Sequence, residues 1–405
     1  MHKSTSHIIT MMPFAKRLAK DGHQVHFLET HSNPKPFKYP PDINYTYIRL
    51  KEEPNSAHSY LALTWENAPK SLDVGYAWMA GDSALVEILK NHPNQTRKVL
   101  DEDWDMVVFD EIFSVTSHAL AYKATKNGRP TVYFSTSAPV YITDYYFSTG
   151  TSLAIRPAIQ HKISTTFDVE SFMSRLQAFA NGVELSLVVN LFSNYFAQEG
   201  IKRLGIEDFS YFGLARDSSL HYIDSLNQLL SPAPTTTDRL DIAYFCDKDE
   251  KLPEDYRKFV EDPASKGTIL IAFGSNAQWK FAPKRLTGSY FSFNGVPEQL
   301  PNLGNHVLLT EWAPQKALLL HNKTVAYVSH GGIKSLKDAV CGGVPVVFMP
   351  IFAEQSYNAE MSRAAGFAHV LDKTSATAAQ LQTSLRDIIG NKKYRRALHF
   401  MFAGL

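Results

Sequence analysis

The 405-residue sequence predicts an α/β fold with two doubly wound, Rossmann-like domains that face a cleft. The chain is long enough to bury two full cores, and short strand-like runs alternate with helical patterns in both halves. A charged, loop-like segment with two prolines separates the halves. We therefore expect a first domain over residues 1–247, a linker over residues 248–267 and a second domain over residues 268–405.

The first domain is expected to open with an amphipathic helix over residues 8–20, because apolar residues recur on one side of it. Apolar and alternating runs predict strands at residues 24–28, 43–50, 105–109 and 131–135, and a helix at residues 115–126. Residues 138–230 are rich in Tyr, Phe and Leu. We expect them to form helices over the cleft, although an apolar layer in an ordinary core explains the same composition.

The second domain centres on a strand, a glycine turn and a helix. Residues 324–329 are a short apolar run, His330-Gly331-Gly332 follows, and residues 333–340 have helical periodicity. Such a turn brings free N–H groups to the positive end of a helix dipole, so a diphosphate can bind there. Further strands are predicted at residues 268–273 and 344–349.

Side chains suited to a nucleotide sugar surround this turn. His330 and Ser335 can donate to a diphosphate, Asp338 can accept from ribose hydroxyls, and Trp312 offers a flat face to a base. Alone, each has a plainer explanation, such as a core tryptophan, a turn or a solvated helix acid. Together they lie at carboxyl-end positions, where open α/β sheets bind ligands. Two residues after the next strand are suited to the hydroxyls of a sugar, Glu354 and Gln355.

Three motifs carry a family resemblance: Trp312-Ala-Pro-Gln315, Ser329-His-Gly-Gly-Ile-Lys-Ser335-Leu-Lys-Asp338 and Pro345-Val-Val-Phe-Met-Pro350-Ile-Phe-Ala-Glu354-Gln355. Together they resemble the donor-binding signature of the animal UDP-glycosyltransferases, the UDP-glucuronosyltransferase family, whose fold is GT-B. The resemblance implies a UDP-sugar site formed by Ser275, Trp312, Gln315, His330, Gly332, Ser335, Asp338, Glu354 and Gln355. Lys334 stands where the family often has asparagine. Its charge would suit a diphosphate, although a solvated helix lysine is the plainer interpretation.

The same resemblance implies an inverting glycosyltransferase, which moves a hexose or glucuronic acid from a UDP-sugar to a hydroxyl of a small lipophilic acceptor. Such a transfer requires a base near the acceptor and a partner that orients the base. His7 matches the family's base, and Asp110, directly after a predicted strand, matches its partner. Glu111 is the alternative carboxylate.

Two departures from the family pattern support a second hypothesis. Too few residues precede His7 to form the family's first, central strand, so we expect its neighbours to be unpaired and the helix of His7 to be unsupported. The connection from Ser275 to the strand-like residues 290–293 is too short for a parallel crossover, so one helix is expected to be missing. The alternative function is a catalytically inactive, truncated UDP-sugar-binding protein or partner subunit.

Composition narrows the partners and cofactors. A formal net charge of +1, from 41 basic and 40 acidic side chains, predicts no nucleic-acid partner. Cys246 and Cys341 lie far apart in the sequence and are expected in different parts of the fold, which argues against a disulfide framework and a zinc site. We expect no metal and no cofactor besides the UDP-sugar co-substrate. The resemblance allows a homo-oligomer or a hetero-oligomer.

The sequence shows neither an apolar targeting segment at its start nor a run of the roughly 18 apolar residues that a spanning helix requires. Members of the resembling family usually begin with a signal peptide and end with a membrane anchor. The resemblance therefore implies the lumenal side of the endoplasmic reticulum membrane, and a chain truncated at both ends.

Overall fold

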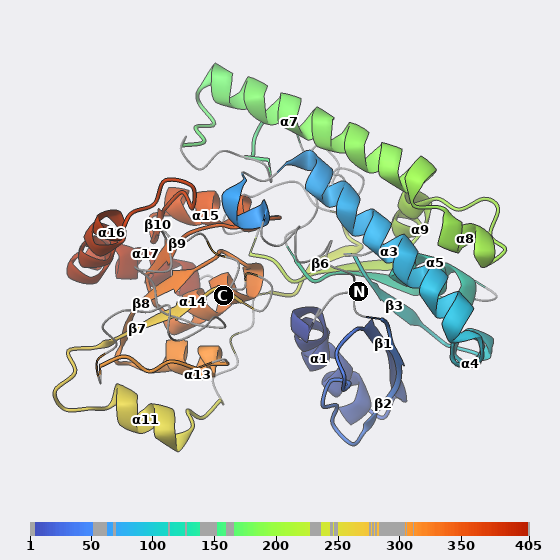
Figure 1. Ribbon diagram of the computed structural model, residues 1–405, viewed down its shortest axis with the longest axis horizontal. Coiled ribbons are helices and arrows are strands. Elements are labelled where there is room, and N and C mark those ends of the chain that lie inside the picture. Colours follow the sequence, from blue (N-terminus) through green and yellow to red (C-terminus); the bar gives the residue numbers. More distant parts are fainter. Residues whose placement is uncertain are drawn as a thin grey trace.

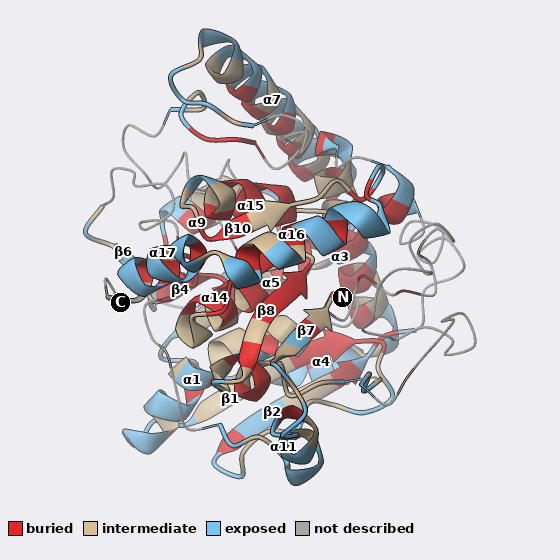
Figure 2. Cartoon of the chain, turned by 90° about the vertical axis from the view of Figure 1, so that its left-hand side faces the viewer, coloured by how far each residue is buried: buried red, intermediate tan, exposed pale blue. Residues whose placement is uncertain are grey.

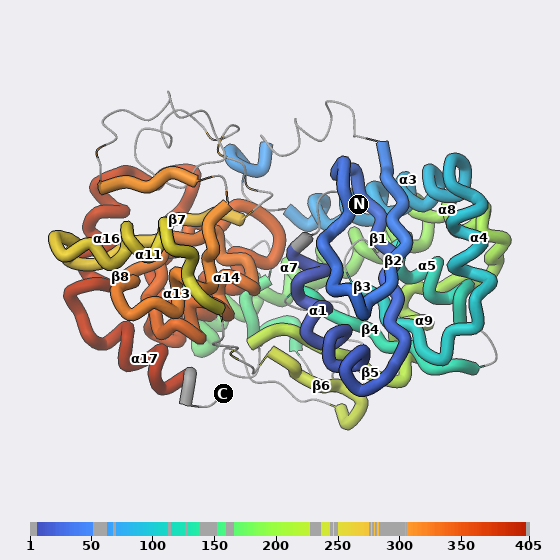
Figure 3. The backbone as a smooth tube through the Cα atoms, turned by 90° about the horizontal axis from the view of Figure 1, so that it is seen from below, coloured from blue at the N-terminus to red at the C-terminus, as the bar shows by residue number. Residues whose placement is uncertain are grey.

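The computed structural model describes residues 5–51, 63–67, 70–111, 114–125, 128–137, 152–158, 166–226, 236–243, 246, 250–274, 277, 279, 282, 304, 306–310 and 312–403. Figure 1 shows two α/β halves side by side, with the N-terminal half in blue to green and the C-terminal half in orange and red. Figure 3 shows the same division from below. In the described part, no helix combines the length and hydropathy that crossing a membrane requires.

The sheet of the C-terminal half is parallel, in the order β10-β9-β8-β7. Its strands are β7 Thr268–Ala272, β8 Thr324–Ser329, β9 Val346–Phe348 and β10 Ala368–Val370. The surrounding helices are α11 Glu254–Val260, α13 Gln315–Leu320, α14 Ile333–Gly342, α15 Gln355–Ala364, α16 Ala378–Gly390 and α17 Lys392–Ala403. The strand predicted at residues 324–329 has its predicted bounds, and the helix predicted at residues 333–340 extends to Gly342.

Both faces of the two central strands of this sheet are buried. On β8, Tyr327 belongs to one apolar cluster, with residues of α13 and α14, whereas Ala326 and Val328 belong to another, with residues of α16. Because successive strand residues point to opposite faces, two clusters on one strand require cover on both sides. Burial on both sides explains why the sequence of β8 is a continuous apolar run, as is typical of buried parallel strands.

The strands of the N-terminal half form two separate parallel sheets. The first pairs β1 Val25–His31 with β2 Ile43–Arg49. The second has the order β3 Val107–Asp110, β4 Thr131–Ser135, β5 Leu220–Ile223 and β6 Arg239–Asp241. Among the described strands, β1 and β3 each lie at the edge of a sheet. Each of these two strands therefore has one edge without a partner among the described strands.

The helices of the N-terminal half are α1 Thr5–Lys20, α3 Ser71–Asn91, α4 Pro93–Asp101, α5 Ser114–Ala124, α7 Phe172–Leu191, α8 Glu199–Arg203 and α9 Tyr211–Arg216, with a π-helical turn η1 Phe192–Phe196 after α7. Helix α7 runs across the top of Figure 1 and buries only one of its sides, as the colours of Figure 2 show. Phe172 and Leu187 are each 67% exposed. An ordinary apolar core therefore does not explain all of its apolar side chains.

Helix α1 connects the two N-terminal sheets. Met12 packs in one apolar cluster with Ile43 of β2. On the other sheet, the ring of Phe14 lies 6.3 Å from that of Phe134 and 5.1 Å from that of Tyr222, between ring centroids. The expectation of an unsupported helix is therefore wrong, because side chains of α1 contact both sheets and take the place of backbone pairing between them.

Segments of the N-terminal half also reach the C-terminal half. Trp65 is fully buried, with its ring centroid 5.1 Å from that of Trp279, and the ammonium of Lys373 donates to the carbonyl of Thr64. The chain leaving β6 is buried there too, since Ala243 and Val340 share one apolar cluster. The predicted bounds of the two domains and the linker stay predictions.

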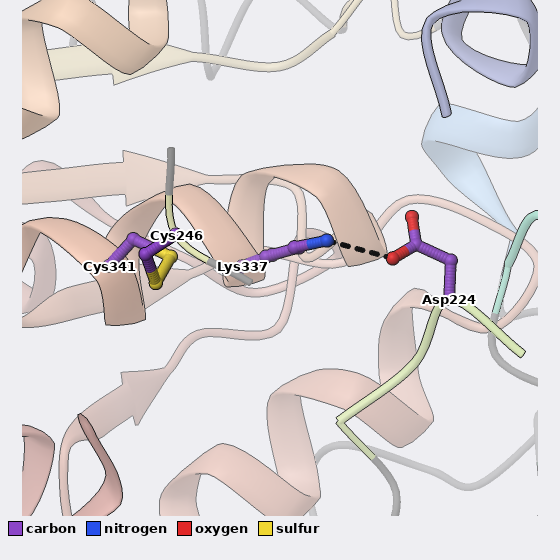
Figure 4. Close-up of a disulfide and its surroundings, with 4 residues drawn as sticks. All are labelled: Asp224, Cys246, Lys337 and Cys341. Atoms are coloured by element: carbon purple, nitrogen blue, oxygen red, sulfur yellow. Dashed lines mark hydrogen bonds and ion pairs between the residues drawn. A yellow bond between two sulfur atoms is a disulfide. The ribbon is translucent and has the colours of Figure 1, made fainter. Parts of the chain in front are cut away.

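The structure corrects the interpretation of the cysteines. Cys246 and Cys341 form a disulfide, drawn in Figure 4, that joins residues 95 positions apart. The prediction failed because sequence distance was taken for spatial distance. The segment that follows β6 packs beside α14, and this packing brings Cys246 to the last turn of that helix.

Candidate active site

Three side chains of the N-terminal half form a hydrogen-bonded group. Nδ1 of His7, in the first turn of α1, lies 2.6 Å from Oδ2 of Asp110. The hydroxyl of Thr136 donates to Oδ1 of Asp110 over 2.7 Å and lies 2.7 Å from the same Nδ1. A carboxylate can only accept, so Nδ1 of the neutral imidazole carries the hydrogen. This arrangement makes Nε2 the basic nitrogen of the ring.

Strand register explains why these residues meet. Asp110 ends β3 and pairs with Phe134 of β4, and Thr136 follows β4 directly. The carboxyl ends of neighbouring parallel strands lie at one edge of a sheet, where ligands bind. Thr136 was missed in the sequence, although its place after a predicted strand was a usable signal. The alternative carboxylate, Glu111, is buried and accepts a hydrogen bond from the hydroxyl of Ser135.

The glycine turn of the C-terminal half encloses His330. A Cβ atom at Gly274 would lie 2.9 Å from Nε2 of the imidazole, and a Cβ at Gly332 would lie 2.7 Å from it. Both glycines therefore leave room for the ring, and Gly331 adopts a φ of 90° that favours glycine. Burial lowers the pKa of His330 to about 4, so the ring is neutral at pH 7. A neutral imidazole can donate a hydrogen bond to a diphosphate but adds no charge.

Gln315, at the start of α13, lies beside the first turns of α14. Its Nε2 donates to Oδ2 of Asp338 over 2.8 Å and to the hydroxyl of Ser335 over 3.4 Å. Its Oε1 accepts from the hydroxyl of Tyr327 over 2.7 Å. Burial raises the pKa of Asp338 to about 6. The structure thus brings together three of the predicted donor-site residues, and Tyr327 fixes the orientation of the amide.

Trp312 is 67% exposed, so one large apolar residue at the predicted base position is available to a ligand. Its carbonyl accepts from the hydroxyls of Tyr256 over 3.3 Å and of Thr310 over 3.2 Å. These bonds hold the backbone of the segment before α13 while the indole stays uncovered. Ser275 lies outside the described residues.

Gln355 has a structural contact that the sequence did not reveal. Its Oε1 accepts from the backbone N–H groups of Ile351 over 2.9 Å and Phe352 over 3.1 Å. The side chain therefore closes the turn between β9 and α15, and its Oε1 already has partners. Burial raises the pKa of Glu354, the adjacent residue of this turn. The turn also contacts the glycine loop, because a Cβ at Gly331 would lie 2.9 Å from the carbonyl oxygen of Gln355.

Lys334 is not the solvated helix lysine of the plainer interpretation. Its ammonium donates to Oδ2 of Asp224 over 3.1 Å and to the carbonyl of Thr136. Helix α14 therefore contacts the same residue that bonds to His7 and Asp110. In the described part of the chain, no group of three or more His, Cys, Asp or Glu side chains could hold a metal ion.

The chain is similar to known glycosyltransferases. A model of the family described as "UDP-glucoronosyl and UDP-glucosyl transferase" matches residues 1–401. Human 2-hydroxyacylsphingosine 1-beta-galactosyltransferase is 30% identical over 198 residues, which cover 46% of this chain and 36% of that protein. Human UDP-glucuronosyltransferase 1A6 is 25% identical over 281 residues, which cover 66% of this chain and 51% of that protein. The chain thus spans between about a third and a half of the length of these curated relatives.

Solved structures of GT-B glycosyltransferases share the fold. Os79 from O. sativa in complex with UDP has a TM-score of 0.61 at 17% identity, covering 99% of this chain and 93% of that chain. Glycosyltransferase VinC in complex with DTDP has a TM-score of 0.60 at 15% identity, covering 100% of this chain and 93% of that chain. The predicted α/β fold of the GT-B type is confirmed, and by its family match the chain belongs to the UDP-glucoronosyl and UDP-glucosyl transferases.

Proposed function

We propose that the chain is an inverting glycosyltransferase, which transfers a hexose or glucuronic acid from a UDP-sugar to a hydroxyl of a small lipophilic acceptor. The observation that carries this proposal is the group formed by His7, Asp110 and Thr136. A histidine held through Nδ1 by a carboxylate presents Nε2 as a base, and the carboxylate stabilises the cation that forms.

At C1 of the sugar, one bond forms and one bond breaks. Nε2 of His7 takes the proton of the acceptor hydroxyl, and the acceptor oxygen attacks C1 of the sugar. The bond between C1 and the diphosphate oxygen breaks on the opposite side, and UDP leaves with the electron pair. Asp110 stays ionised and stabilises the imidazolium. Configuration at C1 inverts because attack and departure occur on opposite faces.

The donor would lie along the first turns of α14. The backbone N–H groups at its N-terminus and the neutral imidazole of His330 would donate to the diphosphate. Asp338, held by Gln315, would accept from the ribose, and the exposed ring of Trp312 would stack on the uracil. Ser335 adds a hydroxyl next to Gln315, and Glu354 and Gln355 remain the proposed contacts to the sugar.

We expect transfer to require no metal ion, because hydrogen-bond donors and the helix dipole can stabilise the charge that develops on the leaving diphosphate. Measuring initial rates with a chelator and after adding Mg²⁺ or Mn²⁺ tests this. Rates that do not respond to either treatment are the expected result. A rate that falls with chelator and recovers with a divalent ion would contradict it.

We also propose a lumenal location at the endoplasmic reticulum membrane. The disulfide between Cys246 and Cys341 supports it, because disulfides persist in the secretory lumen and are rare in the cytosol. Three Asn-x-Thr sequons have exposed asparagines, namely Asn44, Asn94 and Asn322. Fractionation of cells that express the chain, with glycosidase digestion, tests the location; unglycosylated protein in the cytosolic fraction would contradict it.

The alternative is a protein that binds a UDP-sugar, or a partner subunit, without turnover. The observation that favours it is the division of the N-terminal strands into two sheets, since β1 and β3 both leave an edge unpaired among the described strands. A protein that binds the UDP-sugar without transfer would have an intact UDP site and a misplaced base. The two functions therefore differ in turnover rather than in nucleotide affinity.

One experiment separates them. UDP should raise the unfolding temperature of the purified chain more than ADP does, and UDP should be released from a UDP-sugar only when an acceptor is present. His7→Ala should lower that release by about 10²- to 10⁴-fold, the usual contribution of a general base. His23→Ala, at an exposed position of the turn after α1, is the matched control and should keep full activity. Stabilisation by UDP without acceptor-dependent release would establish the non-catalytic alternative.

A further inference from the structure

Two lysines of α14 bind one carboxylate of the other half. Nζ of Lys334 donates to Oδ2 of Asp224 over 3.1 Å, and Nζ of Lys337 donates to Oδ1 over 2.9 Å, as Figure 4 shows for Lys337. Asp224 directly follows β5, and its N–H donates to the carbonyl of Ser135 over 3.0 Å. The carboxyl edge of one sheet is thereby joined to the helix that begins at the carboxyl edge of the other.

This ion pair is poorly exposed to solvent. The side chain of Asp224 is 7% exposed, and those of Lys334 and Lys337 are 25% and 23% exposed. Burial alone would raise the pKa of Asp224, but the two ammonium groups outweigh it and hold the pKa below its ordinary value. The carboxylate is therefore ionised at neutral pH. Removing one partner of such a pair leaves a buried charge without compensation, which is far more costly than losing an exposed pair.

The same lysine reaches the catalytic group. Lys334 donates to the backbone carbonyl of Thr136, and the hydroxyl of Thr136 bonds to both His7 and Asp110. Thr136 therefore links Lys334 of α14 to His7, the proposed base. A shift in the first turn of α14 would move the diphosphate site relative to His7, and would also remove a bond from the residue that contacts the base.

The opposite end of α14 is held as well. Cys341, in its last turns, is bonded to Cys246, which follows β6. Asp224 and Cys246 lie on either side of β6 in the sequence, so one short stretch of chain holds the helix at two points. The helix that carries Ser335 and Asp338 is therefore attached near its beginning to Asp224 of the N-terminal half, and at its end to the segment that follows β6.

We propose that Lys334 is a positioning residue: paired with Asp224, it fixes the first turn of α14, and the leaving diphosphate bound there, at the distance from His7 that transfer requires. The proposal rests on the proposed transferase function and deepens it. It differs from a direct role as a diphosphate ligand, because Nζ is held by two groups of the opposite half.

The test uses Lys334→Gln, Asp224→Asn, the double variant and Lys334→Arg. Each single variant should lower kcat by roughly 10- to 100-fold, since a displacement of about 1 Å can cost as much. The dissociation constant of UDP, measured by calorimetry, should change by less than about twofold. The double variant should lose less kcat than the product of the two single losses, because both changes break the same ion pair. Lys334→Arg should recover most of kcat, since a guanidinium can donate to both partners.

Lys258→Gln is the matched control, because this lysine is 75% exposed and should tolerate the change. Weaker UDP binding in Lys334→Gln but not in Asp224→Asn would overturn the proposal and make Lys334 a diphosphate ligand. Multiplicative losses of kcat in the double variant would also overturn it, because they would mean that the two residues act independently.

A turnover-independent measurement distinguishes failure of this proposal from failure of the transferase function. The shifts in unfolding midpoint of the two single variants should sum to more than the shift of the double variant, because the pair is buried. If the wild-type chain releases no UDP, the transferase function fails while this cycle still tests the pairing. Additive shifts would refute the pairing whether or not the wild-type chain is active.

Discussion

Replacing the disulfide by Cys246→Ser and Cys341→Ser should lower the free energy of unfolding of the C-terminal half. The bond closes a loop of 95 residues, so it removes about 16 cal/mol/K of entropy from the unfolded chain in the loop-closure model. This corresponds to about 4.7 kcal/mol at 25 °C, and the observed effect of removing a native disulfide is about 2–5 kcal/mol. We therefore expect a loss within that range.

Guanidinium unfolding followed by tryptophan fluorescence measures this loss. Trp65 and Trp279 are 0% and 2% exposed in the core of the C-terminal half, so their emission should report its unfolding. The wild-type chain should lose stability when a reductant is added. The double serine variant is the control, because a reductant has no bond to break in it and should leave its midpoint unchanged.

The loop is not closed in the folded protein if two changes in the free energy of unfolding are both below about 0.5 kcal/mol. These are the change when reductant is added to the wild-type chain and the change caused by the double substitution. A lower affinity for UDP in the reduced protein is the expected functional consequence, because Cys341 anchors the end of the helix that carries Asp338.

Three further predictions concern the site itself. Asp110→Asn should lower kcat by about 10³-fold or more, because an amide can stabilise the wrong tautomer of the histidine; a normal kcat at saturating acceptor would contradict this. Gly332→Ala should weaken UDP binding at least about tenfold, since its Cβ would lie 2.7 Å from Nε2 of His330, whereas Gly390→Ala, with open space around its Cβ, should not. UDP affinity should fall as pH drops through about 6, because burial raises the pKa of Asp338 to about 6 and the ionised form is the better acceptor. Because the pKa of Asp338 is raised from 3.8 to about 6 on folding, the free energy of unfolding of the UDP-free protein should fall as pH rises through this range. Calorimetric titration with UDP between pH 5 and 8 should show the fall in affinity in the wild type and not in Asp338→Asn.

Local sequence determined the elements and the place of the site. Residues 324–329 and 131–135 are strands with the predicted bounds, because short apolar runs between turn residues favour buried parallel strands. The carboxyl ends of such strands meet at one edge, so a polar residue after a strand predicts a site without knowledge of its partners. His330 was predicted in this way and Asp110 from the family resemblance, and the structure places both at such edges.

Tertiary structure decided which residues bond to one another. Thr136 lies between His7 and Lys334, Gln355 closes the turn after β9, and Cys246 reaches Cys341. None of these contacts follows from periodicity, because periodicity describes which face of an element is buried and not which distant element covers it. The support of α1 by two separate sheets has the same origin. Packing brings together residues about a hundred positions or more apart, and side-chain geometry then determines which hydrogen bonds form.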